Sequence, residues 1–295
     1  MPERYRGKLF GAAPHTHYIV ASELFADGSG RQSRDLGKVV AAGDQPKDDW
    51  FSPVEIQTGP DGNLYVADWY AVQVNHYKGH EGETNPEMGR VYRMRSPGGA
   101  ADMRIDLKVA SNPELVETWL VHPNRWQRET ALRLLAERKA QDVTPQLKEL
   151  LASGDERDAL NGLWGLYQIG NFGREVALWA LRHPTQNVRA WGVRLLGDEA
   201  SFGSTLISDP EIVNRLRELA VGEPSVEVRL QIACTARRVP TRLGLELIGS
   251  LLTHAADVDD VYLPQAIWWC VEALADDRAA VIEWSRVTDH WNSRV

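Results

Sequence analysis

The sequence predicts an α+β protein of two domains, a partial β-propeller of about six strands over residues 1–98 and an α-solenoid over residues 110–295. The first observation is a series of short β-rich runs with alternating faces in the first hundred residues. The second is that the period of the apolar residues changes from two to about 3.6 from Pro113 onward. A chain of 295 residues with 43% hydrophobic residues can build two cores. We therefore expect the domain boundary near residues 96–99.

A β-hairpin is the clearest element of the N-terminal domain. Residues 54–58 and 64–67 are β-rich, and the sequence GPDG at residues 59–62 lies between them. The proline of this turn restricts φ, and its Asp-Gly pair supplies the positive φ that a tight hairpin requires. Further strands are expected at residues 8–12, 17–25, 32–36 and 90–94.

These strands are too few to close a propeller. A propeller needs about four to eight four-stranded blades of about 40 to 50 residues each, so 98 residues supply at most two. Unpaired strand edges favour aggregation unless something covers them. We therefore expect the chain to be part of a longer gene product. The alternative is a lone sheet packed on the helical domain.

The C-terminal domain repeats one pattern, in which an arginine follows a proline by five residues. The pairs are Pro123 and Arg128, Pro184 and Arg189, and Pro224 and Arg229. Pro264 lies 40 residues after Pro224, and residues 154–170 form a copy without the proline. A spacing of about 30 to 40 residues, with a helix pair in each unit, is typical of a HEAT-like α-solenoid. Partner helices are expected at residues 113–121, 144–152, 174–182, 210–220 and 243–252.

Several polar residues of the repeat have predictable structural roles. The repeated arginines are expected to hydrogen-bond carbonyls or carboxylates of the adjacent repeat. His122 and His183 precede the proline at the same position, which indicates residues of the inter-helix turn rather than ligands. Thr144 and Asp209 each precede a proline and are predicted N-caps.

Cysteines and tryptophans of the helical domain are predicted to be mainly structural. Cys234 and Cys270 lie in apolar helical segments, where a free thiol usually packs as a small buried hydrophobe. No Cys-x-x-Cys-His motif is present, so the chain cannot attach a c-type haem in that way. Most helical tryptophans are predicted to pack in the core, and one or two to form an exposed contact patch. They are Trp119, Trp126, Trp164, Trp179, Trp191, Trp268 and Trp269.

Composition excludes some classes of partner. The net charge is -8 and neither half of the chain is basic, which argues against nucleic acid because phosphate binding needs a basic surface. The first residues lack the apolar segment of a signal peptide, and no run of about 18 apolar residues could span a membrane. We expect a soluble chain without an export signal of its own.

A polar segment after the hairpin is the candidate functional loop. Its candidate residues are Asp68, Trp69, Tyr70, His76, His80 and Glu81. Histidines and carboxylates in a long loop at the rim of a sheet can bind a metal or transfer protons. The alternative is structural: Asp68 caps the strand end, the histidines bond loop carbonyls, and Trp69 and Tyr70 fill the gap between blades.

The order of these motifs resembles a known family. The strings SPVEIQTGPDGNLYVADWY, NHYKGHEG and GRVYRM, followed by HPNRWQRETALRLL, are similar to large multidomain proteins of planctomycete-type bacteria, the membrane-bound dehydrogenase-like or haem-binding PVC-type proteins. In that family, an exported propeller similar to glucose and sorbosone dehydrogenases precedes HEAT-like repeats and a cytochrome c domain. The resemblance covers nearly the whole chain.

The resemblance implies part of an extracytoplasmic or periplasmic quinoprotein-like dehydrogenase of sugars or related alcohols. It implies pyrroloquinoline quinone and Ca²⁺ in the parent propeller, and electron transfer to haem. The family loop matches Asp68, Trp69, Tyr70, His76 and His80. Because the earlier blades and the haem motif are missing here, we expect this chain to be inactive alone and to work with missing domains of the same polypeptide. The alternative function is an autonomous HEAT-repeat scaffold for a protein or glycan partner.

Overall fold

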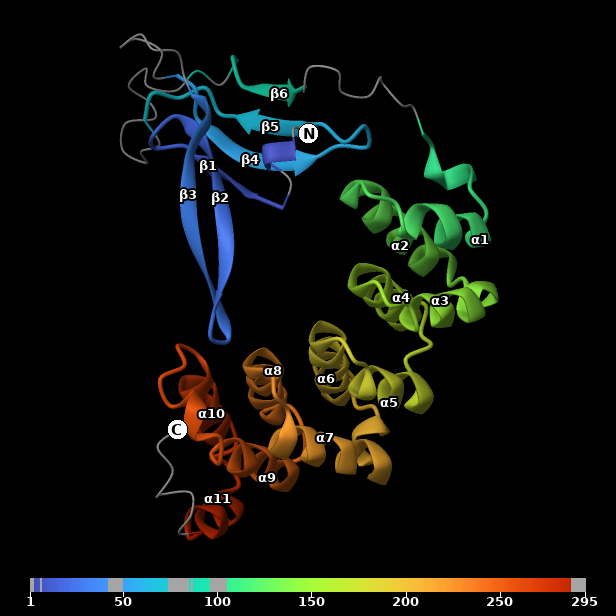
Figure 1. Cartoon of the computed structure of the whole chain (residues 1–295), viewed down its shortest axis with the longest axis vertical. Coiled ribbons are helices and arrows are strands. Elements are labelled where there is room, and N and C mark those ends of the chain that lie inside the picture. Colours follow the sequence, from blue (N-terminus) through green and yellow to red (C-terminus); the bar gives the residue numbers. More distant parts are fainter. Residues whose placement is uncertain are drawn as a thin grey trace. The chain divides into compact units, whose positions relative to one another are not determined.

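The computed structural model describes residues 3–5, 7–41, 50–73, 85, 87–95 and 105–287. The chain forms two compact units (Figure 1). The strand unit comprises Met1–Phe25, Arg31–Val109 and His122–Thr130, and the helical unit comprises Ala26–Gly30, Ala110–Val121 and Ala131–Val295.

The strand unit contains two antiparallel sheets of three strands each within the described residues. The first has the order β1-β2-β3 and the second the order β4-β5-β6. The strands are β1 (Leu9–Ala13), β2 (Tyr18–Asp27), β3 (Gly30–Ala41), β4 (Pro53–Thr58), β5 (Leu64–Asp68) and β6 (Arg90–Met94). All six lie where alternating β-rich runs predicted them, although β3 is much longer than expected.

The predicted partial propeller is wrong. A propeller blade is one sheet of four strands, whereas each sheet here has three strands and no closed propeller forms. Strand lengths explain the difference in the first sheet. The five residues of β1 pair only with Tyr18–Ser22 of β2, so the remainder of β2 and the 12-residue β3 form a two-stranded ribbon (Figure 1).

The turn between β4 and β5 confirms the predicted hairpin. Gly62 has φ +74°, and the Gly59 N–H donates to the carbonyl of Asn63 at 2.8 Å. Asp61 organises the turn by accepting hydrogen bonds from the Asn63 N–H at 3.0 Å and from the Tyr65 hydroxyl at 3.1 Å, and it pairs with Arg93.

The first two turns of α2 (Arg125–Arg138) belong to the strand unit rather than to the helical unit. The Asn124 amide donates to the carbonyls of Gly59 and Pro60, each at 3.0 Å. Gln127 is fully buried, and its amide donates to the Pro60 carbonyl at 2.8 Å. These bonds satisfy the carbonyls of the hairpin turn with donors from a segment about 65 residues later in the chain.

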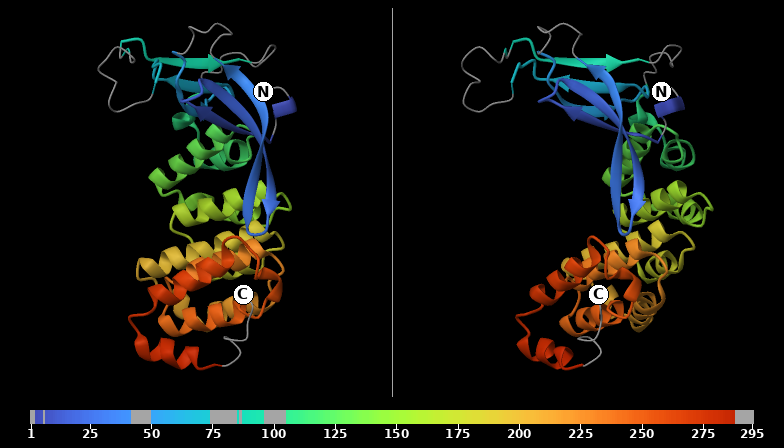
Figure 2. Two further views of the ribbon diagram at one scale, coloured as in Figure 1. Left: turned by 90° about the vertical axis from the view of Figure 1, so that its left-hand side faces the viewer. Right: turned by 60° about the vertical axis from the view of Figure 1, so that its left-hand side comes forward.

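Helices in the rest of the chain stack in two rows (Figures 1 and 2). Helices α4, α6, α8 and α10 are successive neighbours in one row, and α5, α7, α9 and α11 are neighbours in the other. The elements are α1 (Asn112–Glu114), the π-helical η3 (Leu115–Leu120), α3 (Thr144–Leu151), α4 (Glu156–Gln168), α5 (Arg174–Arg182), α6 (Gln186–Ser201), α7 (Pro210–Gly222), α8 (Val226–Ala236), α9 (Thr241–Leu251), α10 (Leu263–Ala273) and α11 (Arg278–Ser285).

This arrangement agrees in part with the predicted solenoid. Helices occur at all the predicted positions, but their lengths vary and short 3₁₀ segments such as η5 (Leu206–Ser208) and η6 (Ala255–Asp257) interrupt the repeat. Leucine, isoleucine, valine and alanine side chains fill the interior between the rows. The stacking is therefore that of an irregular helical repeat.

Close packing of the helix pairs depends on glycine. A Cβ added to Gly162 on α4 would lie 2.5 Å from the Leu151 nitrogen and 2.6 Å from the Leu147 carbonyl oxygen of α3. A Cβ on Gly244 of α9 would lie 2.4 Å from the Ala236 carbonyl oxygen of α8. At these crossings the absence of a side chain lets two backbones approach.

Two of the three repeated arginines, Arg189 and Arg229, link neighbouring repeats as predicted, whereas the third, Arg128, donates to the His122 and Pro123 carbonyls of its own turn. Arg189 donates from Nη1 to the His183 carbonyl at 2.9 Å and from Nε and Nη2 to the Glu223 carboxylate at 2.9 and 2.6 Å. Arg229 likewise donates to the Glu223 carbonyl at 2.6 Å and to the Asp257 carboxylate at 2.6 and 2.5 Å. Arg189 and Arg229 therefore each bind the turn of their own repeat and a carboxylate of the next.

The histidine before the proline accepts a hydrogen bond from the backbone near the start of the following helix. The Nδ1 atoms of His122 and His183 accept hydrogen bonds from the backbone N–H groups two residues later, at 3.0 and 3.1 Å. Because Nδ1 of His183 is an acceptor, its Nε2 is the donor to the Leu151 carbonyl at 3.1 Å. Burial lowers the pKa of His183, which favours this neutral form. The two histidines are turn residues, as predicted.

The two predicted N-caps have different outcomes. Asp209 accepts hydrogen bonds from the N–H groups of Glu211 and Ile212 at 3.0 and 3.2 Å, which confirms it as the N-cap of α7. Thr144 is instead the first residue of α3, and its hydroxyl donates to the Gln141 carbonyl. The 3₁₀ turn Gln141–Val143 leads directly into α3, so the helix begins at Thr144 instead of one residue after it.

No helix in the described ranges has the length and apolar character needed to cross a membrane.

Candidate functional sites

The Asp68-Trp69-Tyr70 segment forms a tight turn at the end of β5. Asp68 is only 4% exposed, and its Oδ1 accepts hydrogen bonds from the N–H groups of Ser52 at 2.7 Å and Tyr70 at 2.9 Å. Its Oδ2 has no hydrogen-bond partner among the described residues. The capping role considered for Asp68 is therefore confirmed.

Tyr70 lies between an aromatic ring and a cation. It has φ +55°, its ring centroid is 5.1 Å from that of Trp50, and the Arg90 guanidinium lies 4.2 Å from its centroid. Trp69 is 57% exposed, so it does not fill an interior gap as considered from the sequence. Trp50 and Arg90 were missed because pairing of β5 with β4 brings Trp50 near Tyr70 and pairing of β5 with β6 brings Arg90 there, which sequence spacing does not reveal.

The other candidate residues of this loop, His76, His80 and Glu81, lie outside the described residues. Within the described ranges, no group of three or more His, Cys, Asp or Glu side chains could hold a metal ion. The described part of the turn, with one buried carboxylate, does not supply the ligand set of a Ca²⁺ site, which needs six to eight oxygens. Pyrroloquinoline quinone and Ca²⁺ remain predictions of the resemblance alone.

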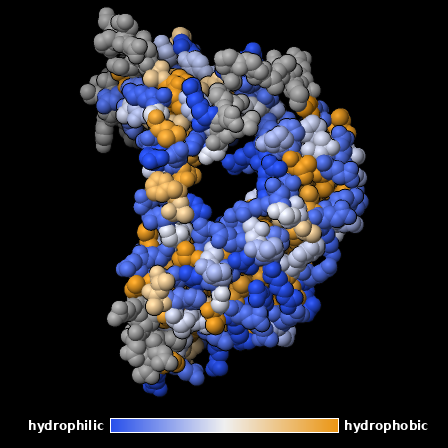
Figure 3. Space-filling view, viewed as in Figure 1, coloured by the Kyte–Doolittle hydropathy of each residue, from blue (hydrophilic) through white to orange (hydrophobic). Residues whose placement is uncertain are grey.

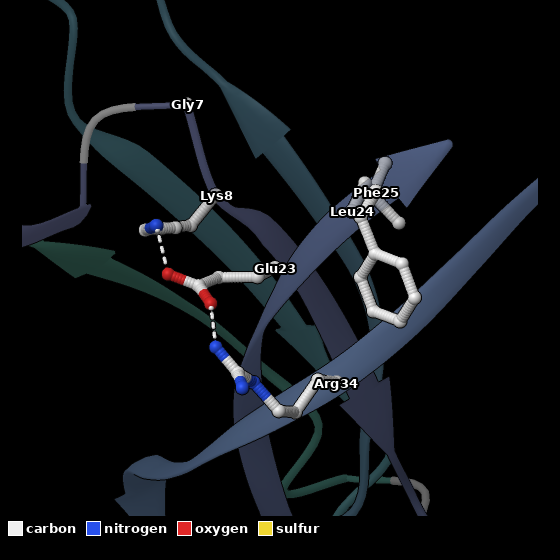
Figure 4. A pocket seen from close by; sticks show the side chains of 6 residues that line it. All are labelled: Gly7, Lys8, Glu23, Leu24, Phe25 and Arg34. Carbon is white, nitrogen blue, oxygen red and sulfur yellow. Dashed lines mark hydrogen bonds and ion pairs between the residues drawn. The ribbon is translucent and has the colours of Figure 1, made fainter. Parts of the chain in front are cut away.

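A shallow hollow of about 470 Å³ lies on the first sheet (Figure 4). Lys8 and Arg34 approach the Glu23 carboxylate from two sides, at 2.5 and 2.6 Å, beside the exposed Leu24 and Phe25. Hydrogen bonds and charges from Lys8 and Arg34 lower the pKa of Glu23. Two cations share one carboxylate here, so the residues that line the hollow carry a net positive charge beside the apolar Leu24 and Phe25.

The row α4-α6-α8-α10 carries aromatic side chains on its solvent side. Figure 1 shows this row on the inner side of the curve that the helical unit follows. We define the inner face as the solvent-accessible side chains of this row, namely Trp164, Trp191, Arg194, Leu230, Gln231, Cys234, Arg237, Arg238, Trp268 and Trp269. Trp191 and Gln231 each lie six residues after the N-cap of their helix and directly before a buried pair, so they occupy equivalent positions, whereas Trp268 and Trp269 follow the buried pair of α10, Ala266 and Ile267.

The tryptophans of the inner face differ in burial. Trp164 and Trp191 are half-buried and pack edge to face with centroids 5.1 Å apart, and the Arg194 guanidinium lies 4.9 Å from the Trp191 centroid. Trp268 and Trp269 are 64% and 49% exposed. The prediction that one or two tryptophans are exposed is confirmed. Elsewhere, hydrophilic residues cover much of the visible helical surface (Figure 3).

The two cysteines have different environments. Cys270 is fully buried, as predicted, and burial raises its pKa to about 12. Cys234 is exposed on α8, so its prediction as a buried thiol is wrong. The apolar neighbours of Cys234 in the sequence face the core, while Cys234 lies on the opposite side of the helix.

Residues 1–98 match a family described as a domain of unknown function (DUF7133). The match covers about a third of the chain and does not extend into the helical repeats. No curated protein matches the sequence.

Proposed function

We propose that the protein is a binding scaffold whose helical unit holds a protein partner along the inner face. The observation that carries this proposal is the exposed pair Trp268 and Trp269 on α10, in the same row as Trp164 and Trp191. Tryptophan and arginine are the residues most enriched where protein interfaces obtain their binding energy. A helical repeat is well suited to this role because its rows present a long continuous surface.

The internal stability of the fold does not explain these tryptophans. Trp268 leaves most of its surface in water, so it contributes little apolar burial to the helical unit. The buried face of α10 consists instead of Leu263, Ala266, Ile267 and Cys270. Exposed large apolar groups that cluster on one face indicate an interaction site.

Other functional predictions rest on the sequence resemblance only. A sugar or alcohol dehydrogenase activity of a parent polypeptide and an extracytoplasmic location remain predictions. Neither uses the inner face, so the scaffold proposal does not depend on them. A glycan is the alternative partner predicted for a helical-repeat scaffold, and it too remains a prediction.

A photo-crosslinking experiment tests the scaffold proposal. A benzoylphenylalanine at position 268 of the full chain should capture a partner in cells of the native host, and the same group at Val221, an exposed position on α7, serves as the control. The captured protein is identified, purified and titrated with the full chain. Trp191→Ala and Trp268→Ala should each raise its Kd by about tenfold or more, whereas Val221→Ala should change it less than about twofold.

Two results contradict the proposal. One is a captured protein that binds the tryptophan variants as tightly as the unchanged chain. The other is equal capture from positions 268 and 221, which shows that the inner face has no preference for a partner.

A further inference from the structure

We infer that the partner presents an acidic segment to a cluster of arginines on the inner face. The inner arginine cluster comprises Arg194 on α6 and Arg237 and Arg238 at the end of α8. This inference rests on the proposed function and specifies the chemistry of the partner. It is carried by the contacts that place Arg194 and Arg238 against the same carboxylate, with the exposed Arg237 next to Arg238 at the end of α8.

Ion-pair contacts place the two helix segments together. Arg238 pairs with Asp198 of α6, and the other carboxylate oxygen of Asp198 lies 3.9 Å from Nε of Arg194. Arg238 also donates to the Thr235 hydroxyl at 3.3 Å. Asp198 therefore holds Arg194 and Arg238 at the junction of α6 and α8.

Cys234 lies three and four residues before Arg237 and Arg238, which places the three residues on one side of the end of α8. The positive charges of Arg238, Arg237 and Arg194 all act on the Cys234 thiol and favour its thiolate, although burial has the larger, opposite effect on its pKa. Cys234 itself is exposed. Cys234 and Arg237 thus lie on the solvent-accessible side of the end of α8.

Charge is not balanced at this point. Among the described residues, Asp198 is the carboxylate in ion-pair contact with Arg194 and Arg238, so one negative charge faces two positive charges there, and Arg237 adds a third positive charge at the end of α8. Arg194 and Arg237 are exposed. Because the whole chain has a net charge of -8, this basic spot is a local exception. A positively charged surface attracts and orients acidic groups.

Stacking on Trp191 orients the Arg194 guanidinium so that it can bind a carboxylate. Its guanidinium lies 4.9 Å from the Trp191 ring centroid, and Trp191 packs against Trp164. A guanidinium placed over a ring still directs its N–H edges to solvent, where they match the two oxygens of a carboxylate. Aspartate or glutamate side chains would bind the arginines, while apolar neighbours in the same segment would contact the tryptophans.

Binding of oligoglutamate to the full chain tests this inference. A fluorescein-labelled oligoglutamate peptide is titrated at low salt, and its fluorescence anisotropy gives Kd. Arg194→Gln/Arg237→Gln should raise Kd by about tenfold, because two charge-assisted contacts are lost. The matched control Arg182→Gln/Arg217→Gln removes two arginines from the other row, α5 and α7, and should change Kd less than about twofold. Unchanged helical circular dichroism confirms that each variant is folded.

Equal binding of oligoglutamate to both double variants would overturn the inference. So would binding of a sulfated oligosaccharide that requires the cluster when oligoglutamate does not bind at all. If the crosslinked partner needs Trp268 but tolerates Arg194→Gln/Arg237→Gln, this inference fails and the scaffold proposal stands. If the partner tolerates Trp191→Ala and Trp268→Ala, the scaffold proposal itself fails.

Discussion

At the scale of single residues, Asp61 shows how one carboxylate stabilises a turn. Burial raises its pKa, but hydrogen bonds from Asn63 and Tyr65 and the charge of Arg93 outweigh this effect and lower the pKa to about 2. The charged form is therefore the one that the folded hairpin prefers. Its sequence neighbours Pro60 and Gly62 supply the turn geometry, and Asp61 supplies the hydrogen bonds.

The pKa of Asp61 predicts an acid-sensitive hairpin. The folded-state pKa is below the ordinary aspartate pKa of 3.8, so the stabilisation is complete above about pH 4 and is lost as pH falls toward about 2. An NMR titration of the Asp61 carboxyl carbon should show a midpoint near 2. A midpoint near 4 would refute the proposed network. Asp61→Asn should destabilise the hairpin by about 1–3 kcal/mol at neutral pH, measured by hydrogen exchange of β4 and β5.

The two cysteines should react at very different rates. An alkylating reagent at neutral pH should modify exposed Cys234 in the folded chain and leave Cys270 intact, because Cys270 is buried and its pKa is raised to about 12. Peptide mass spectrometry before and after addition of urea measures both sites. Modification of both thiols at similar rates in the folded chain would contradict this assignment.

At the scale of elements, the helix pairs depend on small residues at their crossings and on arginines between repeats. The glycines and the arginines both occur at recurrent positions, but they stabilise the helical unit in different ways. Glycine permits contact between two backbones, whereas arginine satisfies buried carbonyls and carboxylates of two repeats at once. Substitutions of a glycine and of an arginine therefore test the two contributions independently.

Replacement of Gly162 should weaken the pair α3-α4. In Gly162→Ala the added methyl group collides with backbone atoms of Leu147 and Leu151, so the free energy of unfolding should fall by about 1–3 kcal/mol despite the better helix propensity of alanine. Urea denaturation followed by helical circular dichroism measures this change. Gly154→Ala is the control, since its Cβ meets no atom within 4 Å and its stability should hardly change.

The buried pair Arg229–Asp257 should matter more than an exposed pair of the same kind. Its side chains are 8% and 3% exposed, so Arg229→Gln leaves a buried carboxylate without its cation and should cost about 3–5 kcal/mol. Arg217→Gln breaks the pair with Glu246, whose side chains are 44% and 47% exposed, and should cost less than about 1 kcal/mol. Equal losses in urea denaturation would show that burial does not decide the strength of these pairs.

At the scale of the whole molecule, the compact units do not follow the order of the chain. The strand unit takes in His122–Thr130, which sequence analysis assigned entirely to the helical repeats. The side-chain amides of Asn124 and Gln127 connect this segment to the strands by donating to carbonyls of the hairpin turn. A domain boundary near residue 98 therefore divides groups that bind one another.

A truncation experiment tests this division. A fragment of residues 1–109 lacks the donors for the Gly59 and Pro60 carbonyls, so its hairpin, which contains Leu64 and Tyr65 but no lysine or arginine, should be cleaved by chymotrypsin faster than in a fragment of residues 1–138. Asn124→Ala/Gln127→Ala in the full chain should likewise speed hydrogen exchange in β4 and β5. Indistinguishable hairpins in all these proteins would contradict the assigned role of α2.

Local patterns in the sequence predicted the strands, the helices, the GPDG turn, the histidine turns and the links formed by the arginines. These features depend on residues close in the chain, on a regular period or on a repeated spacing, so they can be recognised without coordinates. The Asp68 cap was also predictable, since aspartate commonly accepts hydrogen bonds from nearby backbone groups.

Tertiary structure alone decided which strands share a sheet, and it replaced the expected propeller with two three-stranded sheets. It also decided that Cys234 faces solvent and that Arg90 stacks on Tyr70. The inner arginine cluster was also decided by the tertiary structure, because the packing of α6 on α8 brings Arg194 and Arg238 together. Such contacts join residues far apart in the chain, and their energies depend on burial and distance, which a one-dimensional pattern does not contain.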